Sequence, residues 1–239
     1  MPETRKSDRV ALITGANKGI GLETARQLGK QGIIVLIGSR DKQRGERAAA
    51  ALRSEGINAQ SISLDVTQQP TIDAAVAEVN GHFGKLDILV NNAAILPEIK
   101  PPSESDLGNL RGTFDANFFG LVAVTQAFLP LIRKSTAGRI VNVSSLLGSL
   151  AGFQSGKDYF AYSASKVAVN AFTIGLAAEL KNTPIKVNAA SPGYTATDMN
   201  NFRGTQTVEQ GAIIPVRLAT LPPNGPTGTF VDLNGPIAW

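Results

Sequence analysis

Tyr162 and Lys166 are the two ends of the stretch YSASK, four positions apart. On a helix, residues at positions i and i+4 lie one above the other, so the ammonium can come close to the phenol oxygen. At about 4–5 Å and an effective dielectric of roughly 20, this attraction favours the phenolate by about 3–4 kcal/mol. The phenol pKa then moves from about 10 toward neutrality. The spacing predicts a tyrosine that gives and takes a proton, although two unrelated helix residues can show the same spacing.

Two serines, Ser144 and Ser145, end the apolar run GRIVNV that begins at Gly138. In an open α/β sheet, ligands bind at the carboxyl ends of the strands. A serine hydroxyl at that edge can hydrogen-bond a substrate oxygen that gains negative charge during a reaction. The alternative is an ordinary pair of serines that closes a strand and begins a turn.

A glycine-rich stretch, TGANKGIG from Thr14 to Gly21, follows the first apolar run. Small residues let backbone N–H groups and a helix N-terminus approach a pyrophosphate. The spacing G-x-x-x-G-x-G differs from the longer-spaced dinucleotide fingerprint, and it is not a P-loop because no Lys-Ser or Lys-Thr follows. The stretch predicts a dinucleotide phosphate site, with a tight strand–helix turn that binds nothing as the alternative.

The second apolar run ends in Gly38-Ser39-Arg40. In sheets that bind NAD, an acidic residue near this position receives the ribose hydroxyls. Here Ser39 and Arg40 stand in that region, and Lys18 lies on the facing loop. Two cations suit a 2′-phosphate, so the pattern favours NADP(H) over NAD(H). Two ordinary surface cations are the alternative.

Apolar runs and helical patterns alternate along the chain and must position these residues. Strands are predicted at residues 10–14, 33–38, 59–64, 86–91, 139–143, 185–189 and 229–233. Helices are predicted at residues 22–30, 43–54, 72–80, 121–133 and 167–180. This alternation predicts one α/β domain over residues 1–239, a Rossmann-like, doubly wound, seven-stranded parallel sheet with helices on both faces. Residues 97–109 and 193–206 look like loops that line a pocket.

The composition excludes several kinds of chemistry. The 239 residues contain no cysteine, which excludes disulfides, cysteine–metal sites and thiol nucleophiles. The single histidine, His82, excludes a cage of several histidines, and no metal site is predicted.

The charge and hydropathy patterns bear on partners and location. The net charge of +4 is scattered rather than gathered in a basic stripe, so no nucleic-acid partner is expected. The first residues lack a signal-peptide core. The longest charge-free apolar stretch, residues 116–132, is shorter than a typical membrane span and suits a buried helix. We therefore expect a cytoplasmic protein with no membrane partner.

Taken together, the motifs resemble those of the short-chain dehydrogenase/reductase family in its single-domain form, over nearly the whole chain. The matching motifs are TGANKGIG at 14–21, LDV at 64–66, NNA at 91–93, Asn117, VSS at 143–145, Tyr162 with Lys166, and SPG at 191–193. The stretch Asn17-Lys18 and the C-terminal GPTG and Trp239 look most like the carbonyl-reductase branch. The resemblance implies an enzyme that transfers hydride between NADP(H) and a small ketone, aldehyde or alcohol.

The resemblance also implies roles for four catalytic residues. Tyr162 corresponds to the proton donor to the carbonyl oxygen, and Lys166 to the residue that lowers its pKa and holds the nicotinamide ribose. Ser145 corresponds to the residue that polarises the carbonyl. Asn117 corresponds to the residue that supports a water-linked proton relay behind Lys166.

The same resemblance implies a set of cofactor contacts besides those of Tyr162 and Lys166. They are Gly15, Asn17, Lys18, Gly19, Ile20 and Gly21 at the phosphates, Arg40 at the 2′-phosphate, Asp65, Val66, Asn91 and Ala93 around the adenine, and Pro192, Gly193, Thr195 and Thr197 at the carboxamide.

The sequence departs from the family pattern in two places. Ala94 stands where the family usually has glycine, and the interval from Ser145 to Tyr162 is a few residues longer than usual. That interval, with the loop 146–158, is still too short for the long extra helix of the family's monomeric carbonyl reductases. We therefore expect a homodimer or a homotetramer.

Two other functions stay open from the sequence. A β-ketoacyl-carrier-protein reductase would use the same catalytic residues and would need a basic patch for the acidic carrier, to which Arg133, Lys134 and Arg139 could contribute. A sensor or scaffold would bind NADPH without turnover and would not need the proton donor. For the substrate, the apolar residues of the three loops predict a partly apolar pocket; they include Leu147, Phe153, Tyr194, Met199 and Phe202.

Overall fold

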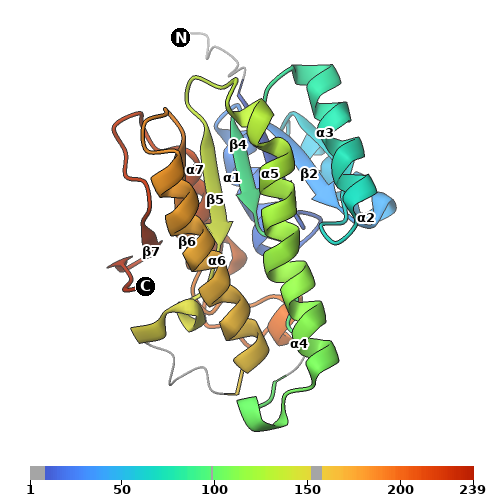
Figure 1. Cartoon of the computed structure of the whole chain (residues 1–239). Coiled ribbons are helices and arrows are strands. Elements are labelled where there is room, and N and C mark those ends of the chain that lie inside the picture. Colours follow the sequence, from blue (N-terminus) through green and yellow to red (C-terminus); the bar gives the residue numbers. More distant parts are fainter. Residues whose placement is uncertain (1–8, 98, 152–157) are drawn as a thin grey trace.

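The computed structural model describes residues 9–97, 99–151 and 158–239. Within them, one sheet contains eight strands in the order β3-β2-β1-β4-β5-β6-β7-β8, and helices cover both faces (Figure 1). The strands are β1 Val10–Thr14, β2 Ile34–Ser39, β3 Ala59–Ser63, β4 Ile88–Asn91, β5 Arg139–Val143, β6 Lys186–Ala190, β7 Phe230–Asp232 and β8 Gly235–Pro236. The predicted α/β, doubly wound sheet is confirmed.

The sheet has one strand more than the seven that the sequence predicts. The first seven strands are parallel, and β8 runs antiparallel to β7. The chain reverses at Asn234, whose N–H donates to the Asp232 carboxylate at 2.7 Å, and at Gly235, which has φ +124°. β8 has only two residues, too few to give a period-2 pattern in the sequence.

Buried apolar side chains alternate between the two faces of the sheet along each strand, and they form one hydrophobic core on each face. Ala11 and Ile13 of β1 pack into one cluster of buried residues, and Val10 and Leu12 pack into the other, because successive side chains point to opposite faces. The first core is covered by α1 Gly19–Lys30, α2 Lys42–Ser54 and α7 Val208–Ala219, and the second by α3 Gln69–Phe83, α5 Gly120–Ile132 and α6 Phe160–Glu179.

Two helices have no counterpart in the sequence prediction, α7 and the short α4 (Leu107–Phe114). α7 contains Gly211 and Pro215, residue types that weaken a helical pattern. Its N-terminus is fixed by Thr207 and Gln210, each of which accepts the other's backbone N–H. Three short 3-10 turns, η1 Pro102–Glu104, η3 Leu146–Gly148 and η5 Asp198–Asn200, complete the described elements.

α4 and α5 are joined by a π-helical turn, η2 (Asp115–Phe119), into one helical stretch from Leu107 to Ile132. By length and composition alone, this stretch is long and apolar enough to cross a membrane. In the structure, 44% of an apolar segment of 18 residues within it is buried. It packs against α3, α6 and β4 and forms part of the second core. Turns of the π type occur frequently at functional sites, and η2 contains Asn117.

The doubly wound topology opens a crevice beside β1. Its neighbours are β2 and β4, and the chain leaves the carboxyl ends of β1 and β4 toward opposite faces of the sheet. The Thr14 hydroxyl holds these two ends together, because it accepts the backbone N–H groups of Asn92 at 2.9 Å and Ala93 at 3.0 Å. Ligands of open α/β sheets bind in such a crevice.

Candidate active site

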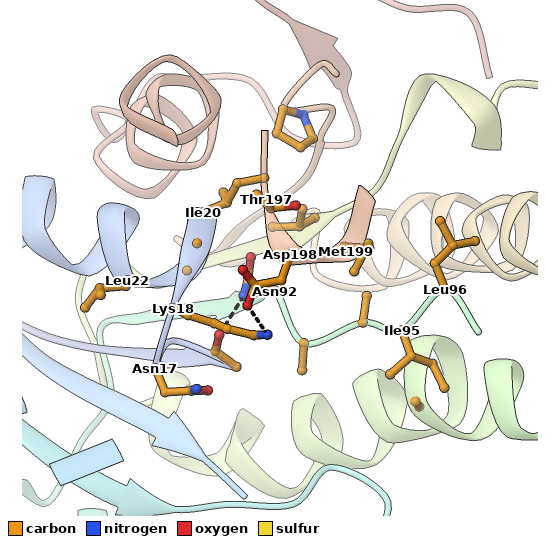
Figure 2. A pocket seen from close by; sticks show the side chains of 18 of the residues that line it. Asn17, Lys18, Ile20, Leu22, Asn92, Ile95, Leu96, Thr197, Asp198 and Met199 are labelled. Atoms are coloured by element: carbon orange, nitrogen blue, oxygen red, sulfur yellow. Dashed lines mark hydrogen bonds and ion pairs between the residues drawn. The ribbon is translucent and has the colours of Figure 1, made fainter. Parts of the chain in front are cut away.

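The cleft at this crevice has a volume of about 640 Å³, within the size range of small-molecule sites. Of the predicted residues, the structure brings the following to its walls: Gly15, Asn17, Lys18, Gly19, Ile20, Gly21, Arg40, Asp65, Val66, Ala93, Tyr162, Lys166, Pro192 and Thr197. Asn91, Asn117, Ser145, Gly193 and Thr195 are not among its lining residues. Figure 2 shows the side chains around the glycine-rich turn and the segment that faces it.

The glycine-rich turn between β1 and α1 has the shape of a phosphate cradle. Gly15 and Gly19 have φ of +64° and +58°, which side chains rarely adopt. A Cβ on Gly15 would lie 3.0 Å from the Ala93 Cα, and one on Gly21 would lie 2.5 Å from the Asn92 amide nitrogen. In the described part of the chain no side chain caps the N-terminus of α1, so its N–H groups are open to an anion. This fits the pyrophosphate of a dinucleotide.

Two adjacent asparagines at the end of β4, Asn91 and Asn92, lie differently from the prediction. Asn91 is buried, and its amide donates to Thr125 at 2.8 Å and Asn142 at 2.9 Å, behind the cleft. Asn92 lines the cleft and donates to the Thr14 carbonyl at 2.9 Å. Asn92 has no predicted role, although the NNA motif contains it. In a strand, adjacent side chains point to opposite faces, and this separates the two.

Tyr162 lies in the first turn of α6, and Lys166 lies one turn further along the same helix. The Lys166 ammonium is 5.5 Å from the centroid of the Tyr162 ring and donates to the Val143 carbonyl at 2.8 Å. Ser145, just beyond β5, hydrogen-bonds Tyr162 through its side chain. The i, i+4 arrangement expected from the sequence is therefore present.

The pKa values of this pair differ from the sequence-based expectation. Burial raises the pKa of Tyr162 to about 12, and the hydrogen bond with Ser145 opposes this rise. Burial also lowers the pKa of Lys166 to about 8. Both groups lose hydration, which disfavours their charged forms. The expected acidic phenol was wrong for this structure, in which Tyr162 keeps its proton at neutral pH.

Asn117 ties the segment after β4 to the start of α6. Its amide accepts the Ile95 N–H at 2.8 Å and donates to the Ile95 carbonyl at 3.0 Å and to the Ser165 hydroxyl at 3.1 Å. The Ser165 hydroxyl in turn donates to the Tyr162 carbonyl at 2.6 Å. Asn117 therefore positions the backbone around Tyr162 through its side chain.

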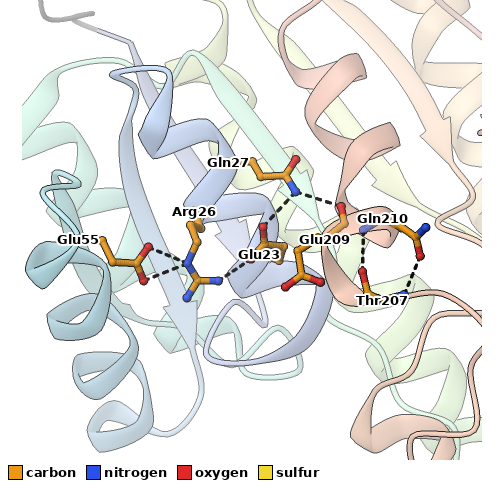
Figure 3. A network of polar contacts seen from close by, with 7 residues as sticks. All are labelled: Glu23, Arg26, Gln27, Glu55, Thr207, Glu209 and Gln210. Carbon is orange, nitrogen blue, oxygen red and sulfur yellow. Dashed lines mark hydrogen bonds and ion pairs between the residues drawn. The ribbon is translucent and has the colours of Figure 1, made fainter.

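Among the residues that the structure describes, four cationic side chains line the cleft: Lys18, Arg26, Arg40 and Lys166. Figure 3 shows that Arg26 is held between Glu23 and Glu55, with an Arg26 Nε–Glu55 Oε2 distance of 2.9 Å. Lys18 pairs with Asp198. Arg40 is exposed at the end of β2.

The segment after β6 forms the remaining wall. Gly193 has φ +80°, and the Thr195 hydroxyl donates to the Pro192 carbonyl at 3.2 Å. Thr195 therefore shapes the turn from behind the cleft, while Pro192 and Thr197 line it. Met199 and Phe202, expected as pocket residues, line it too, whereas the expected Phe153 falls outside the described residues. Among the described residues, no cluster of three His, Cys, Asp or Glu could hold a metal ion.

A family model of short chain dehydrogenases matches residues 9–207, so this chain belongs to the short-chain dehydrogenase family. Short-chain dehydrogenase/reductase 1 of Saponaria officinalis is 35% identical over 287 aligned residues, covering 95% of this chain and 94% of that protein. The (+)-neomenthol dehydrogenase of Arabidopsis thaliana is 35% identical, covering 94% and 96%. The structure of NADPH-bound carbonyl reductase from chicken fatty liver has a TM-score of 0.85 at 26% identity, covering 97% and 99%.

Membership in the family confirms the resemblance found in the sequence. The chain is an oxidoreductase of the class that uses a nicotinamide cofactor and acts on small carbonyl or alcohol compounds. The alignment with the Saponaria protein has more positions than this chain has residues, so that relative contains segments without a counterpart here.

The burial of Lys166 has a measurable consequence for stability. Its pKa is about 8 in the folded chain and about 10.4 when unfolded, so between these values the unfolded chain binds more protons. The contribution of this lysine to the free energy of unfolding therefore rises with pH from about 8 to 10. We expect Lys166→Met to lack this rise when chemical denaturation is measured across that range.

Lys181→Met, which removes an exposed lysine just after α6, is the matched control. Its pH curve should run parallel to that of the wild type. A Lys166→Met curve that is also parallel would contradict the burial of the ammonium.

Proposed function

We propose that this chain is an NADP(H)-dependent carbonyl reductase that converts a ketone or aldehyde to an alcohol, reversibly, with Tyr162 as general acid and base. The proposal depends on one observation above all. Tyr162 lies on the cleft wall, hydrogen-bonded to Ser145 and one helical turn from Lys166, beside the glycine-rich turn. A sensor or scaffold that only binds NADPH would have no use for this arrangement.

The chain supplies a proton and the geometry, and the cofactor, when bound, supplies the hydride. The Ser145 hydroxyl and the Tyr162 phenol hydrogen-bond the carbonyl oxygen, where negative charge develops. With its pKa raised to about 12, Tyr162 is protonated at neutral pH and gives its proton to that oxygen. Lys166 holds the nicotinamide ribose, and Asn117, through Ile95 and Ser165, positions the Tyr162 backbone.

The preference for NADP(H) is supported by the end of β2. Arg40 is exposed on the cleft wall, and Lys18 lies on the same cleft. The carboxylate of the next residue, Asp41, accepts the Arg44 N–H at 3.0 Å as the cap of α2, which engages it away from a ribose. The chicken carbonyl reductase, similar in fold, has NADPH bound.

The substrate end of the cleft is apolar. Among the described residues, Ile95, Leu96, Pro97, Met199 and Phe202 give this part of the wall its apolar character. We propose an apolar, uncharged carbonyl substrate. Burial of apolar surface stabilises such a ligand by roughly 25 cal/mol per Å².

The three basic residues that a β-ketoacyl-carrier-protein reductase would need beside its cleft do not form such a patch here. Arg139 is 1% exposed at the start of β5, and its guanidinium donates to the Leu221 carbonyl at 2.7 Å. Arg133 and Lys134 lie just before that strand, bonded to Glu179 and Asn80. The start of β5 is opposite its carboxyl end, where the cleft opens, so these residues do not flank the cleft.

Tyr162→Phe tests the proposed proton donor. We expect turnover of carbonyl compounds, followed at 340 nm with NADPH, to fall by about 10²- to 10⁴-fold, because phenylalanine has no proton to give. Binding of NADPH should persist. Tyr159→Phe, three residues earlier and outside the cleft lining, is the control and should keep its turnover. Unchanged turnover in Tyr162→Phe would refute the assignment.

Arg40→Asp tests the proposed phosphate contact. Reversing the charge at the end of β2 removes a charge-assisted hydrogen bond, so we expect KM for NADPH to rise by about tenfold or more. KM for NADH should change little. Arg47→Asp makes the same charge change at an exposed position of α2 outside the cleft. Equal changes for both cofactors in Arg40→Asp would count against the contact.

We also propose that the chain forms a homodimer or homotetramer. Large apolar side chains are exposed on η2 and α6, with Phe119 at 57% and Ile174 at 42%, and such side chains can be buried between subunits. Light scattering should give two or four times the chain mass of 25.1 kDa. A mass of one chain at micromolar concentration would contradict the proposal.

The expected cytoplasmic location, without a membrane or nucleic-acid partner, stays a prediction.

A further inference from the structure

Asp198 and Lys18 meet across the mouth of the cleft (Figure 2). The Lys18 ammonium is 2.5 Å from a carboxylate oxygen of Asp198. The lysine belongs to the turn after β1, and the aspartate begins η5, 180 positions later in the chain. The two side chains are 57% and 49% exposed. The pair thus joins the cofactor wall to the substrate wall at a place that solvent and ligands can reach.

The loop 194–206 holds Asp198 in position, because its own backbone closes on itself. Ala196 donates to the Gln206 carbonyl at 2.8 Å, and Phe202 donates to the Thr197 carbonyl at 2.9 Å. The Asn200 amide donates to the Thr195 carbonyl at 2.8 Å. These bonds form a compact turn, and this turn holds the backbone of Asp198 opposite Lys18.

The other cations of the cleft differ in their availability. Arg26 is shared between Glu23 and Glu55, and Lys166 is buried against the Val143 carbonyl. Of the described residues, Arg40 and Lys18 remain as exposed cations of the cleft wall. Of these two, Lys18 already has a carboxylate partner.

We propose that Asp198 is a specificity-determining residue that competes with the 2′-phosphate of the cofactor for the Lys18 ammonium. The inference rests on the proposed preference for NADP(H). A phosphate dianion carries more charge than a carboxylate, and an exposed ion pair is weak, so the phosphate can displace Asp198. Displacement has an energetic cost, and this lowers the preference for the phosphorylated cofactor. With NAD(H), which has no 2′-phosphate, the pair stays intact.

Adenosine 2′,5′-bisphosphate and 5′-AMP isolate this effect, because they differ only in the 2′-phosphate and need no catalysis. Calorimetric titration gives the dissociation constant of each for the wild type and for Asp198→Asn. We expect Asp198→Asn to increase the ratio of the two affinities, in favour of the bisphosphate, by about two- to fivefold. Asp73→Asn makes the same charge change on α3, outside the cleft lining, and should leave the ratio unchanged.

The same measurement in a Lys18→Met variant tests whether Lys18 is the partner for which Asp198 and the 2′-phosphate compete. In Lys18→Met, the ammonium is absent, so adding Asp198→Asn should no longer change the affinity ratio, as a double-mutant cycle requires. Thermal unfolding of each variant verifies that it is folded.

The outcomes separate the two proposals. If the wild type prefers the bisphosphate but Asp198→Asn leaves the ratio unchanged, the competition is overturned and the preference for NADP(H) stands. The competition is also overturned if both ligands gain equally, since Asp198 would then only obstruct entry to the cleft. If the wild type binds both ligands equally well, the proposed cofactor preference itself fails.

Discussion

The hydroxyl of Thr14 joins the two halves of the sheet at the point where the strand order reverses. It accepts two backbone N–H groups from the segment after β4, which brings that segment against the turn after β1. The approach is so close that a Cβ on Gly15 would touch Ala93 at 3.0 Å. The glycines of the turn therefore serve two purposes, because they admit the neighbouring backbone and leave N–H groups open to a phosphate.

Burial governs the chemistry of the other wall. Burial shifts the pKa of Tyr162 upward and that of Lys166 downward, in each case toward the neutral form, and several polar groups around them are paired within the protein. The Ser144 hydroxyl donates to the Asn170 amide at 2.7 Å, and that amide donates to the Gly148 carbonyl at 2.9 Å. A buried polar network whose members are satisfied holds side chains in one arrangement. The reacting side chains thus depend on a network that runs from Ser144 on the cleft wall to Asn170 and Gly148 behind it.

Local patterns in the sequence were sufficient for the seven parallel strands, for most helices and for the Tyr162–Lys166 pair, because strand and helix periodicity act over a few residues. Three features of the site depend on tertiary structure, and local patterns in the sequence did not predict them. Register decides that Asn92 rather than Asn91 faces the cleft. Burial decides the direction in which the pKa of Tyr162 moves. The Lys18–Asp198 pair joins positions too far apart in the chain for any local pattern.

The closed hydrogen bonding of the loop 194–206 also bears on how this scaffold diversifies. Gly204 lies so close to the Thr195–Ala196 backbone that a Cβ there would approach it to 2.1 Å, so the loop folds back upon itself. Met199 and Phe202, which line the cleft, lie outside the sheet, so their exchange leaves strand register unchanged. Evolution or an engineer can therefore change the accepted compound at these two positions while Thr197 and Asp198, which face the glycine-rich turn, are kept.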